Sequence, residues 1–240
     1  MAPSELILNP DGSIYHLHLR PEQLADIIIT VGDPDRVGGV SKYFDRIDEK
    51  VQKREFVTHT GELNGKRLSV ISTGIGTDNI DIVFNELDAL ATIDLDRREI
   101  ADQQRQLTFV RIGTSGALQA DLGVDTWLAS TAAVGLEGLL HFYETQPGDD
   151  EKALLASLEL LLRESNYSFP ITPYWAAGSN DLLDLFSHEK MQTGVTITAS
   201  GFYAPQGREI RLKSRFNRPL IDKLVTWRNG NYRLTNLEME

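Results

Sequence analysis

Short apolar runs alternate along this chain with amphipathic segments, and this alternation predicts a layered α/β fold. β-branched residues dominate the run at 25–31, and a second apolar run at 108–112 carries one arginine. Runs of this length without polar alternation are typical of strands buried on both faces. The segments at 79–90 and 151–164 have apolar residues at helical spacing. We therefore expect strands that alternate with covering helices.

The same pattern predicts the remaining elements. We expect strands at residues 13–19, 51–60, 67–72, 126–134 and from 194. Arg54 and Glu55 lie on the expected strand 51–60, and Asn64-Gly65 predicts a hairpin between that strand and 67–72. Residues 93–106 are charge-rich and predict a solvated helix face or loop, and a helix is expected to begin at Ser179 or Asn180. Because the sequence shows no linker and no internal repeat, we expect a single domain.

Two of the predicted strands end in glycine-containing turns beside arginine. The run at 25–31 continues into residues 32–36 (GDPDR), and the run at 108–112, which carries Arg111, continues into residues 113–116 (GTSG). Free backbone N–H groups, hydroxyls and guanidinium groups in a small space favour an anion pocket. Taken alone, each turn is explained equally well as an ordinary end of a strand.

Two other patterns carry weaker functional interpretations. His16 and His18 would face one side of a strand and could suit a metal, but no carboxylate or third histidine has useful spacing, so an ordinary polar edge is the better interpretation. Gly74 and Gly76 resemble the start of a dinucleotide-binding turn, but Asn79 occupies the third glycine position. A glycine-rich turn before a packed helix explains them.

Residues 194–211 form a second informative block. A predicted strand leads to Phe202 and Tyr203, and the turn at 205–208 (PQGR) presents an amide and a guanidinium. An aromatic face beside these two groups suits a flat heterocycle with exocyclic oxygens. The alternative is a core aromatic followed by a polar surface loop, which composition alone favours slightly.

Composition and charge narrow the classes of partner. The formal net charge of −11 and the pI near 4.9 argue against nucleic acid and anionic membranes, which need a basic face. The 240 residues contain no cysteine, which excludes disulfides, thiolate metal sites and a cysteine nucleophile and fits a cytoplasmic protein. No apolar stretch approaches the roughly 20 residues of a membrane span.

Five motifs, taken in order, resemble the nucleoside phosphorylase superfamily, and the similarity is closest to the uridine phosphorylases. The motifs are residues 32–37 (GDPDRV), 72–76 (STGIG), 111–116 (RIGTSG), 202–208 (FYAPQGR) and 236–240 (NLEME). The similarity runs from about His16 to the last residue, with interruptions near 94–106 and 146–174. It implies an αβα sandwich around a mixed, distorted sheet, assembled as homodimers or homohexamers. It also implies that phosphate cleaves a nucleoside to a free base and ribose 1-phosphate.

The resemblance assigns the phosphate-binding residues. Gly32, Arg36, Arg111 and Thr114 would hold phosphate, and Arg54 would reach in from a neighbouring subunit. Arginines suit this role because their fork of N–H groups makes bidentate contacts with phosphate oxygens. Phosphate is itself the nucleophile, so the chain needs no nucleophilic side chain.

The ribose-binding residues follow from the same resemblance. Glu238, Met239 and Glu240 would hold the sugar, and His16 of a partner subunit would approach the 5′-hydroxyl. Carboxylates accept hydrogen bonds from sugar hydroxyls. A negative charge there would also stabilise the cationic sugar of an oxocarbenium-like transition state.

The base-binding residues would be Phe202, which stacks on the ring, and Gln206 with Arg208, which bind the oxygens and the N3 edge of uracil. Arg208 would stabilise the charge that develops on the departing pyrimidine, so that no dedicated general acid is needed. Arg111, Arg208 and Glu240 are therefore the expected catalytic residues.

Two departures from the family pattern lead to further expectations. The resemblance implies no cofactor, with inorganic phosphate as co-substrate and a monovalent cation near Glu55, but residues 77–79 (TDN) are larger than is usual beside that cation site. The chain also ends inside its last motif, whereas family members continue into a helix that packs on the sheet. We expect a C-terminally truncated domain spanning residues 1–240, with impaired catalysis because Glu240 lacks that helix.

Three functions are compatible with the sequence. Gln206 and Arg208 favour phosphorolysis of a pyrimidine nucleoside such as uridine. A purine nucleoside phosphorylase or a nucleosidase is the second possibility, although a nucleosidase uses water and has no need of Arg36 and Arg111 together. The third is a noncatalytic homologue that binds nucleosides.

Overall fold

The computed structural model describes residues 1–165, 167, 169–186, 190–216 and 218–240. These residues form two compact units, residues 1–113 and 114–240, and each is described by itself. The organisation of residues 1–240 as one domain stays a prediction.

The first unit is a mixed five-stranded sheet in the order β2-β3-β4-β1-β7. Its strands are β1 (Ile27–Val31), β2 (Arg46–Lys53), β3 (Phe56–Leu63), β4 (Lys66–Ser72) and β7 (Thr108–Ile112). β1 pairs in parallel with β4 and β7, whereas β2, β3 and β4 pair antiparallel. The predicted Asn64-Gly65 hairpin joins β3 to β4, with both residues at positive φ.

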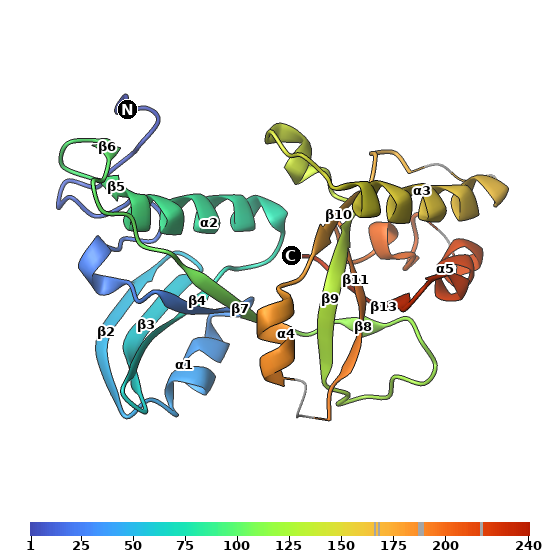
Figure 1. Cartoon of the computed structure of the whole chain (residues 1–240), viewed down its shortest axis with the longest axis horizontal. Coiled ribbons are helices and arrows are strands. Elements are labelled where there is room, and N and C mark those ends of the chain that lie inside the picture. The colour runs from blue at the N-terminus through green and yellow to red at the C-terminus, as the bar shows by residue number, and fades with distance from the viewer. Residues whose placement is uncertain (166, 168, 187–189, 217) are drawn as a thin grey trace. The chain divides into compact units, whose positions relative to one another are not determined.

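Helices cover both faces of this sheet (Figure 1). On one face, α2 (Thr77–Thr92) packs Val83 and Leu87 against Ile28 and Ile71. On the other face, α1 (Asp35–Ser41) packs Val37 against strand residues. Successive residues of a strand point to opposite faces, so Ile28 of β1 joins one core and Ile29 and Val31 join the other. A short 3-10 turn, η1 (Pro21–Gln23), precedes β1.

The second unit has a six-stranded sheet in the order β10-β9-β11-β13-β12, with β8 beside β13. Its strands are β8 (Gly116–Ala117), β9 (Leu128–Gly135), β10 (Tyr174–Ala177), β11 (Gln192–Thr198), β12 (Arg228–Asn229) and β13 (Tyr232–Glu238). β9, β11 and β13 are parallel, and the other pairs are antiparallel. The pairing shifts register beside Gly194, where an added Cβ would lie 2.0 Å from Cγ2 of Thr235. The glycine therefore permits the close approach of β13 at this distortion.

Two helices share one apolar core with this second sheet. α3 (Asp149–Glu164) and α5 (Arg218–Thr226) bury Leu158 and Leu224 together with Trp175 and Val195 from the strands. α4 (Asn180–Phe186) follows β10, and short 3-10 turns lie at η2 (Leu139–Phe142) and η3 (Ala204–Gln206). Both units are mixed α/β, which confirms the predicted fold class.

Three predicted elements differ from the structure. Residues 13–19 form no strand, because the hydrogen bonds of Asn9 and the left-handed backbone of His18 (φ 57°) fold them into a compact loop. The predicted strand at 51–60 is interrupted by a turn at Arg54 (φ 56°), so Arg54 and Glu55 lie between β2 and β3. Residues 93–100 contain a small hairpin, β5 (Ile93–Asp94) with β6 (Glu99–Ile100), around Arg98 (φ 55°).

Candidate functional site

The predicted phosphate residues of the first unit lie at one edge of its sheet. Val31 at the end of β1 pairs in register with Ser72 of β4 and with Ile112 of β7. Because these three strands are parallel, residues 32, 73 and 113 all leave the sheet at the same edge. This is the edge at which open α/β sheets bind ligands. Gly32 lies there, and Arg36 follows in the first turn of α1.

Arg111 belongs to the same edge. Arg111 pairs with Thr30 near the end of β7, and its guanidinium lies beside Gly113, two residues further along the chain. A Cβ at residue 113 would lie 3.2 Å from Nη2 of Arg111, so the glycine keeps space for the guanidinium. Thr114, the other predicted phosphate ligand, is the first residue of the second unit.

His16 and Arg54, the two residues that we expect to be shared between subunits, lie in one cluster around Tyr15. The Tyr15 and His16 rings meet edge to face with centroids 4.8 Å apart. Cζ of Arg54 lies 6.0 Å from the centroid of the Tyr15 ring, and Nζ of Lys53 lies 5.1 Å from it. The sequence analysis missed Tyr15, although its position directly before His16 was a usable signal.

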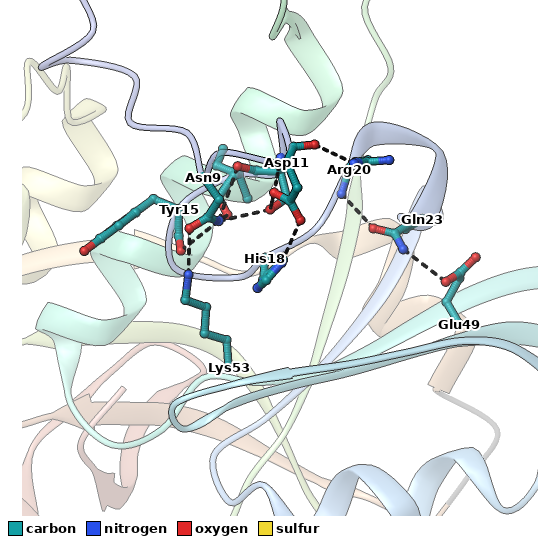
Figure 2. Close-up of polar contacts among 10 residues, drawn as sticks. Asn9, Asp11, Tyr15, His18, Arg20, Gln23, Glu49 and Lys53 are labelled. Carbon is teal, nitrogen blue, oxygen red and sulfur yellow. Dashed lines mark hydrogen bonds and ion pairs between the residues drawn. The ribbon is translucent and has the colours of Figure 1, made fainter.

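The loop that carries this cluster is held by a local polar network (Figure 2). Nδ2 of Asn9 donates to the carbonyl of Ile14 (2.8 Å), and Nζ of Lys53 donates to Oδ1 of Asn9 (2.7 Å). The carboxylate of Asp11 accepts hydrogen bonds from the hydroxyl (2.6 Å) and N–H (3.1 Å) of Ser13 and contacts His18. These contacts, led by the Ser13 hydroxyl, hold the pKa of the Asp11 carboxyl well below its usual range.

Glu86 is a further residue that sequence reasoning missed. Its carboxylate accepts hydrogen bonds from the backbone N–H groups of His16 and Leu17, and it also contacts the His16 ring. The available signal was a carboxylate on the apolar stripe of α2, three residues after Val83 and four before Leu90.

The predicted ribose residues lie at the carboxyl end of β13, in the second unit. Glu238 is the last residue of that strand, and Met239 and Glu240 follow it. Oγ1 of Thr198, at the end of the neighbouring β11, lies 3.0 Å from Oε1 of Glu238 and 2.9 Å from the carbonyl oxygen of Glu240. This hydroxyl links the two strand ends and was not predicted from the sequence.

The predicted base residues meet in the loop after β11. Cζ of Arg208 lies 4.1 Å from the ring centroid of Phe202, whose side chain is 51% exposed. Nη1 of Arg208 donates to the carbonyl of Phe202 (2.8 Å) and to Oε1 of Gln206. Nε2 of the buried Gln206 donates to the carbonyl of Glu238 (3.2 Å). The structure thus joins the aromatic ring, amide and guanidinium to the predicted ribose residue Glu238.

β8 supports this cluster from the other side of β13. A Cβ at Gly116 would lie 3.2 Å from Nη2 of Arg208, so the guanidinium lies close against this strand. Just before it, Oγ of Ser115 accepts a hydrogen bond from Nδ2 of Asn236 (2.9 Å). The loop that contains Thr114 is therefore tied to the strand that carries Glu238.

Other features of the described residues have structural explanations. A cavity of about 440 Å3 in the first unit is lined by Leu24–Ile27, Lys66, Arg67 and Arg105. Both of these arginines donate to the carbonyl of Leu24, so they fix the loop before β1. Within the described part of the chain, no group of three or more histidine or acidic residues could hold a metal. No helix in that part is long and apolar enough to cross a membrane.

Comparison with known proteins places these residues in a family. The model of the "Phosphorylase superfamily" matches residues 26–240. A uridine phosphorylase of Thermococcus kodakarensis is 31% identical over 234 residues, covering 96% of this chain and 70% of the relative. A uridine phosphorylase of Haemophilus influenzae is 30% identical over 233 residues, covering 95% and 77%.

A solved structure agrees with these matches. The Trypanosoma brucei nucleoside phosphorylase, described as showing uridine phosphorylase activity, aligns with a TM-score of 0.77 and 28% identity. The alignment covers 98% of this chain and 83% of that protein. The match thus extends over nearly the whole chain in both sequence and fold, and this protein belongs to the phosphorylase superfamily.

Proposed function

We propose that this protein is a pentosyltransferase that cleaves uridine with inorganic phosphate to uracil and ribose 1-phosphate. The observation that carries the proposal is the cluster of Phe202, Gln206 and Arg208 against the carboxyl end of β13. Its chemistry suits uracil because the ring offers a face for stacking and an edge with carbonyl oxygens and one N–H. The uridine phosphorylases among its relatives support the same substrate.

The hydrogen-bonding capacity of the Gln206 amide agrees with uracil as the base. Its Oε1 already accepts from Arg208 and its Nε2 already donates to Glu238. An amide oxygen has two lone pairs and an amide nitrogen has two hydrogens, so with respect to the described residues one acceptor and one donor position remain. These two positions match the N3–H and an adjacent carbonyl of uracil.

Phosphate would bind through Gly32, Arg36, Arg111 and Thr114, and Arg54 of a second subunit would complete the set. The edge formed by β1, β4 and β7 supports this role because Gly32 and the guanidinium-bearing residues Arg36 and Arg111 all lie there. The bound anion would attack C1′ of the sugar directly, so the protein supplies position and charge rather than a nucleophile.

Glu238, Met239 and Glu240 would hold the ribose while C1′ gains positive charge. A carboxylate near the sugar stabilises that charge, and Arg208 stabilises the negative charge that passes to the pyrimidine as the glycosidic bond breaks. Arg111, Arg208 and Glu240 are therefore the proposed catalytic residues. Because the carboxylate and Arg208 stabilise charge that grows only toward the transition state, loss of either should lower kcat more than substrate binding, whereas loss of Arg111 should weaken binding of the phosphate that it holds.

We further propose a homodimer or homohexamer in which His16 and Arg54 serve the site of a neighbouring subunit. Their shared position around Tyr15 supports this arrangement, since one surface would deliver both side chains. A monovalent cation near Glu55 belongs to the same proposal and predicts different rates in potassium and in lithium. A cytoplasmic location stays a prediction that rests on the lack of cysteine.

A base-release assay tests the proposed function. Uridine, deoxyuridine, thymidine, inosine and adenosine are each incubated with the protein, with and without phosphate. We expect uracil from uridine only with phosphate, strong loss in Arg208→Ala, and little change in the matched control Arg211→Ala, an exposed arginine of the same segment. Release without phosphate would indicate a nucleosidase, release of purines alone a purine phosphorylase, and binding without turnover a noncatalytic homologue.

A further inference from the structure

A single carboxylate from α2 holds both the backbone and the ring of His16. Oε1 and Oε2 of Glu86 lie 2.9 Å and 3.0 Å from the N–H nitrogen of His16. Oε2 also accepts from the N–H of Leu17 (2.8 Å), and Oε1 lies 2.6 Å from Nδ1 of the His16 ring. The Glu86 side chain is only 13% exposed, whereas the His16 side chain is 26% exposed.

This arrangement determines which ring nitrogen carries the proton. An ionised carboxylate only accepts hydrogen bonds, so the nitrogen that faces Glu86 is Nδ1–H. In the neutral ring, Nε2 is then the free lone pair. A carboxylate behind a histidine serves the same purpose in metal sites, where it fixes the tautomer and the orientation of the ring.

The rest of the loop is already held without Glu86. The Asn9, Asp11 and Lys53 contacts fix the loop before His16, and the Asp11 carboxylate also contacts the His18 ring after it (Figure 2). The His16 ring also contacts the Tyr15 ring, with an angle of 79° between the two ring planes. Contact between Glu86 and Nδ1 is therefore the interaction that orients the imidazole, beyond what folding of the loop requires.

We propose that Glu86 is a positioning residue for the nucleoside 5′-hydroxyl: it holds His16 as the Nδ1–H tautomer, with Nε2 directed to accept a hydrogen bond from that hydroxyl. The inference rests on the proposed function, which gives His16 its role at the ribose. It adds the residue that selects nucleosides with a free 5′-hydroxyl over those without one. Glu86 itself touches no substrate.

Uridine and 5′-deoxyuridine, which differ only in this hydroxyl, provide the kinetic test. Glu86→Gln places an amide N–H against groups that are themselves donors, so the ring should lose its orientation. We expect kcat/KM for uridine to fall about tenfold, the size of one lost hydrogen bond to substrate, while kcat/KM for 5′-deoxyuridine is unchanged. His16→Ala should give the same selective loss, and the double variant should lose no more than either single variant.

Asp88→Asn is the matched control, because it makes the same change of charge at an exposed position of the same helix. We expect this variant to leave kcat/KM unchanged for both uridine and 5′-deoxyuridine. If Glu86→Gln keeps its fold and lowers kcat/KM equally for both nucleosides, or lowers it for neither, the proposal is wrong. Thermal melting of each variant shows whether an equal loss of kcat/KM comes from unfolding. If it does, Glu86→Asp, which keeps the negative charge, must restore the preference for uridine over 5′-deoxyuridine.

A measurement that needs no turnover separates this inference from the proposed function. 15N signals of the five histidines, assigned with His16→Ala, report which ring nitrogen is protonated. We expect protonated Nδ1 in the wild-type protein, and a shift of the Nε2 signal on adding uridine but not 5′-deoxyuridine. Protonated Nε2, or no response to uridine, overturns the inference. Absence of phosphate-dependent uracil release, with this response intact, would overturn only the proposed function.

Discussion

Replacement of Asn236 by alanine should destabilise the second unit and disturb the loop before β8. Asn236 is 5% exposed on β13. Its Nδ2 donates to Oγ of Ser115 (2.9 Å), and its Oδ1 lies 3.1 Å from Oγ1 of Thr196 and 2.8 Å from Oγ1 of Thr235. One amide therefore joins β11 and β13 to the segment that contains Thr114.

The expected loss of stability depends on which hydrogen bonds the partners of Asn236 keep in the variant. Thr235 keeps a hydrogen bond to the carbonyl of Val195, and Ser115 is exposed and can turn to water. The equivalent of two neutral hydrogen bonds is lost, at about 1 kcal/mol each, so the free energy of unfolding should fall by about 2 kcal/mol. For a chain of this length, that corresponds to a Tm lower by roughly 4–8 °C.

Urea unfolding followed by tryptophan fluorescence measures this cost. Trp175 and Trp227 are buried in the core of the same unit, with ring centroids 6.1 Å apart, so their emission should report its unfolding. The control Ser115→Ala removes only the exposed partner and should change stability by no more than about 0.5 kcal/mol. In kinetics, Asn236→Ala should raise the KM for phosphate several-fold, because Thr114 adjoins the loosened residue.

Two results would refute this reasoning. A loss of stability below about 0.5 kcal/mol in Asn236→Ala would mean that its hydrogen bonds contribute no net stability. An unchanged KM for phosphate in a variant that is destabilised as expected would show that the tie between Asn236 and Ser115 does not position Thr114.

Three further predictions test the site and the loop. Arg111→Ala should raise the KM for phosphate at least about tenfold, through loss of charge-assisted hydrogen bonds, with little change in uridine affinity. An equal loss of affinity for phosphate and for uridine would show that this arginine has a structural role. Gly116→Ala places a methyl group 3.2 Å from Nη2 of Arg208 and should raise the KM for uridine several-fold, whereas an unchanged KM would show that the guanidinium need not lie against β8. Because hydrogen bonds from Ser13 lower the folded-state pKa of Asp11, their stabilisation is present above the unfolded pKa of about 3.9 and is lost as the pH falls further. Asp11→Asn should therefore flatten the fall of Tm below about pH 4, and a variant that keeps the full acid dependence would contradict this.

The local pattern of the chain determined the fold class and the family. β1, α2, β9 and α3 were predicted close to their observed bounds, because strand and helix periodicities depend only on neighbouring residues. The motifs identified the superfamily, since a glycine turn beside an arginine carries its chemistry within a few residues. β10 and α5 were not predicted: β10 has only four residues, and α5 has nine residues whose helical spacing of Leu220, Ile221 and Leu224 was missed.

The structure decided how these local pieces meet. Hydrogen bonding between Glu86 and His16 spans 70 residues, and that between Asn236 and Ser115 spans 121. The turn at Arg54 was read as strand because strand formers lie on either side of it, at Val51 and at residues 56–58, and only the pairing of β2 with β3 shows the reversal. The roles assigned to the site residues stay predictions for the experiments above.

The sequence alone therefore determined which chemical groups this protein has available, because residue types and their local spacing are written directly in the chain. Only the tertiary structure decided which of these groups share a hydrogen bond. Such contacts depend on strand register and helix packing, and their energies come from residues far apart in sequence. For this reason the contacts of Glu86, which belongs to none of the motifs, and those of the Asn236 amide became visible only in the folded protein.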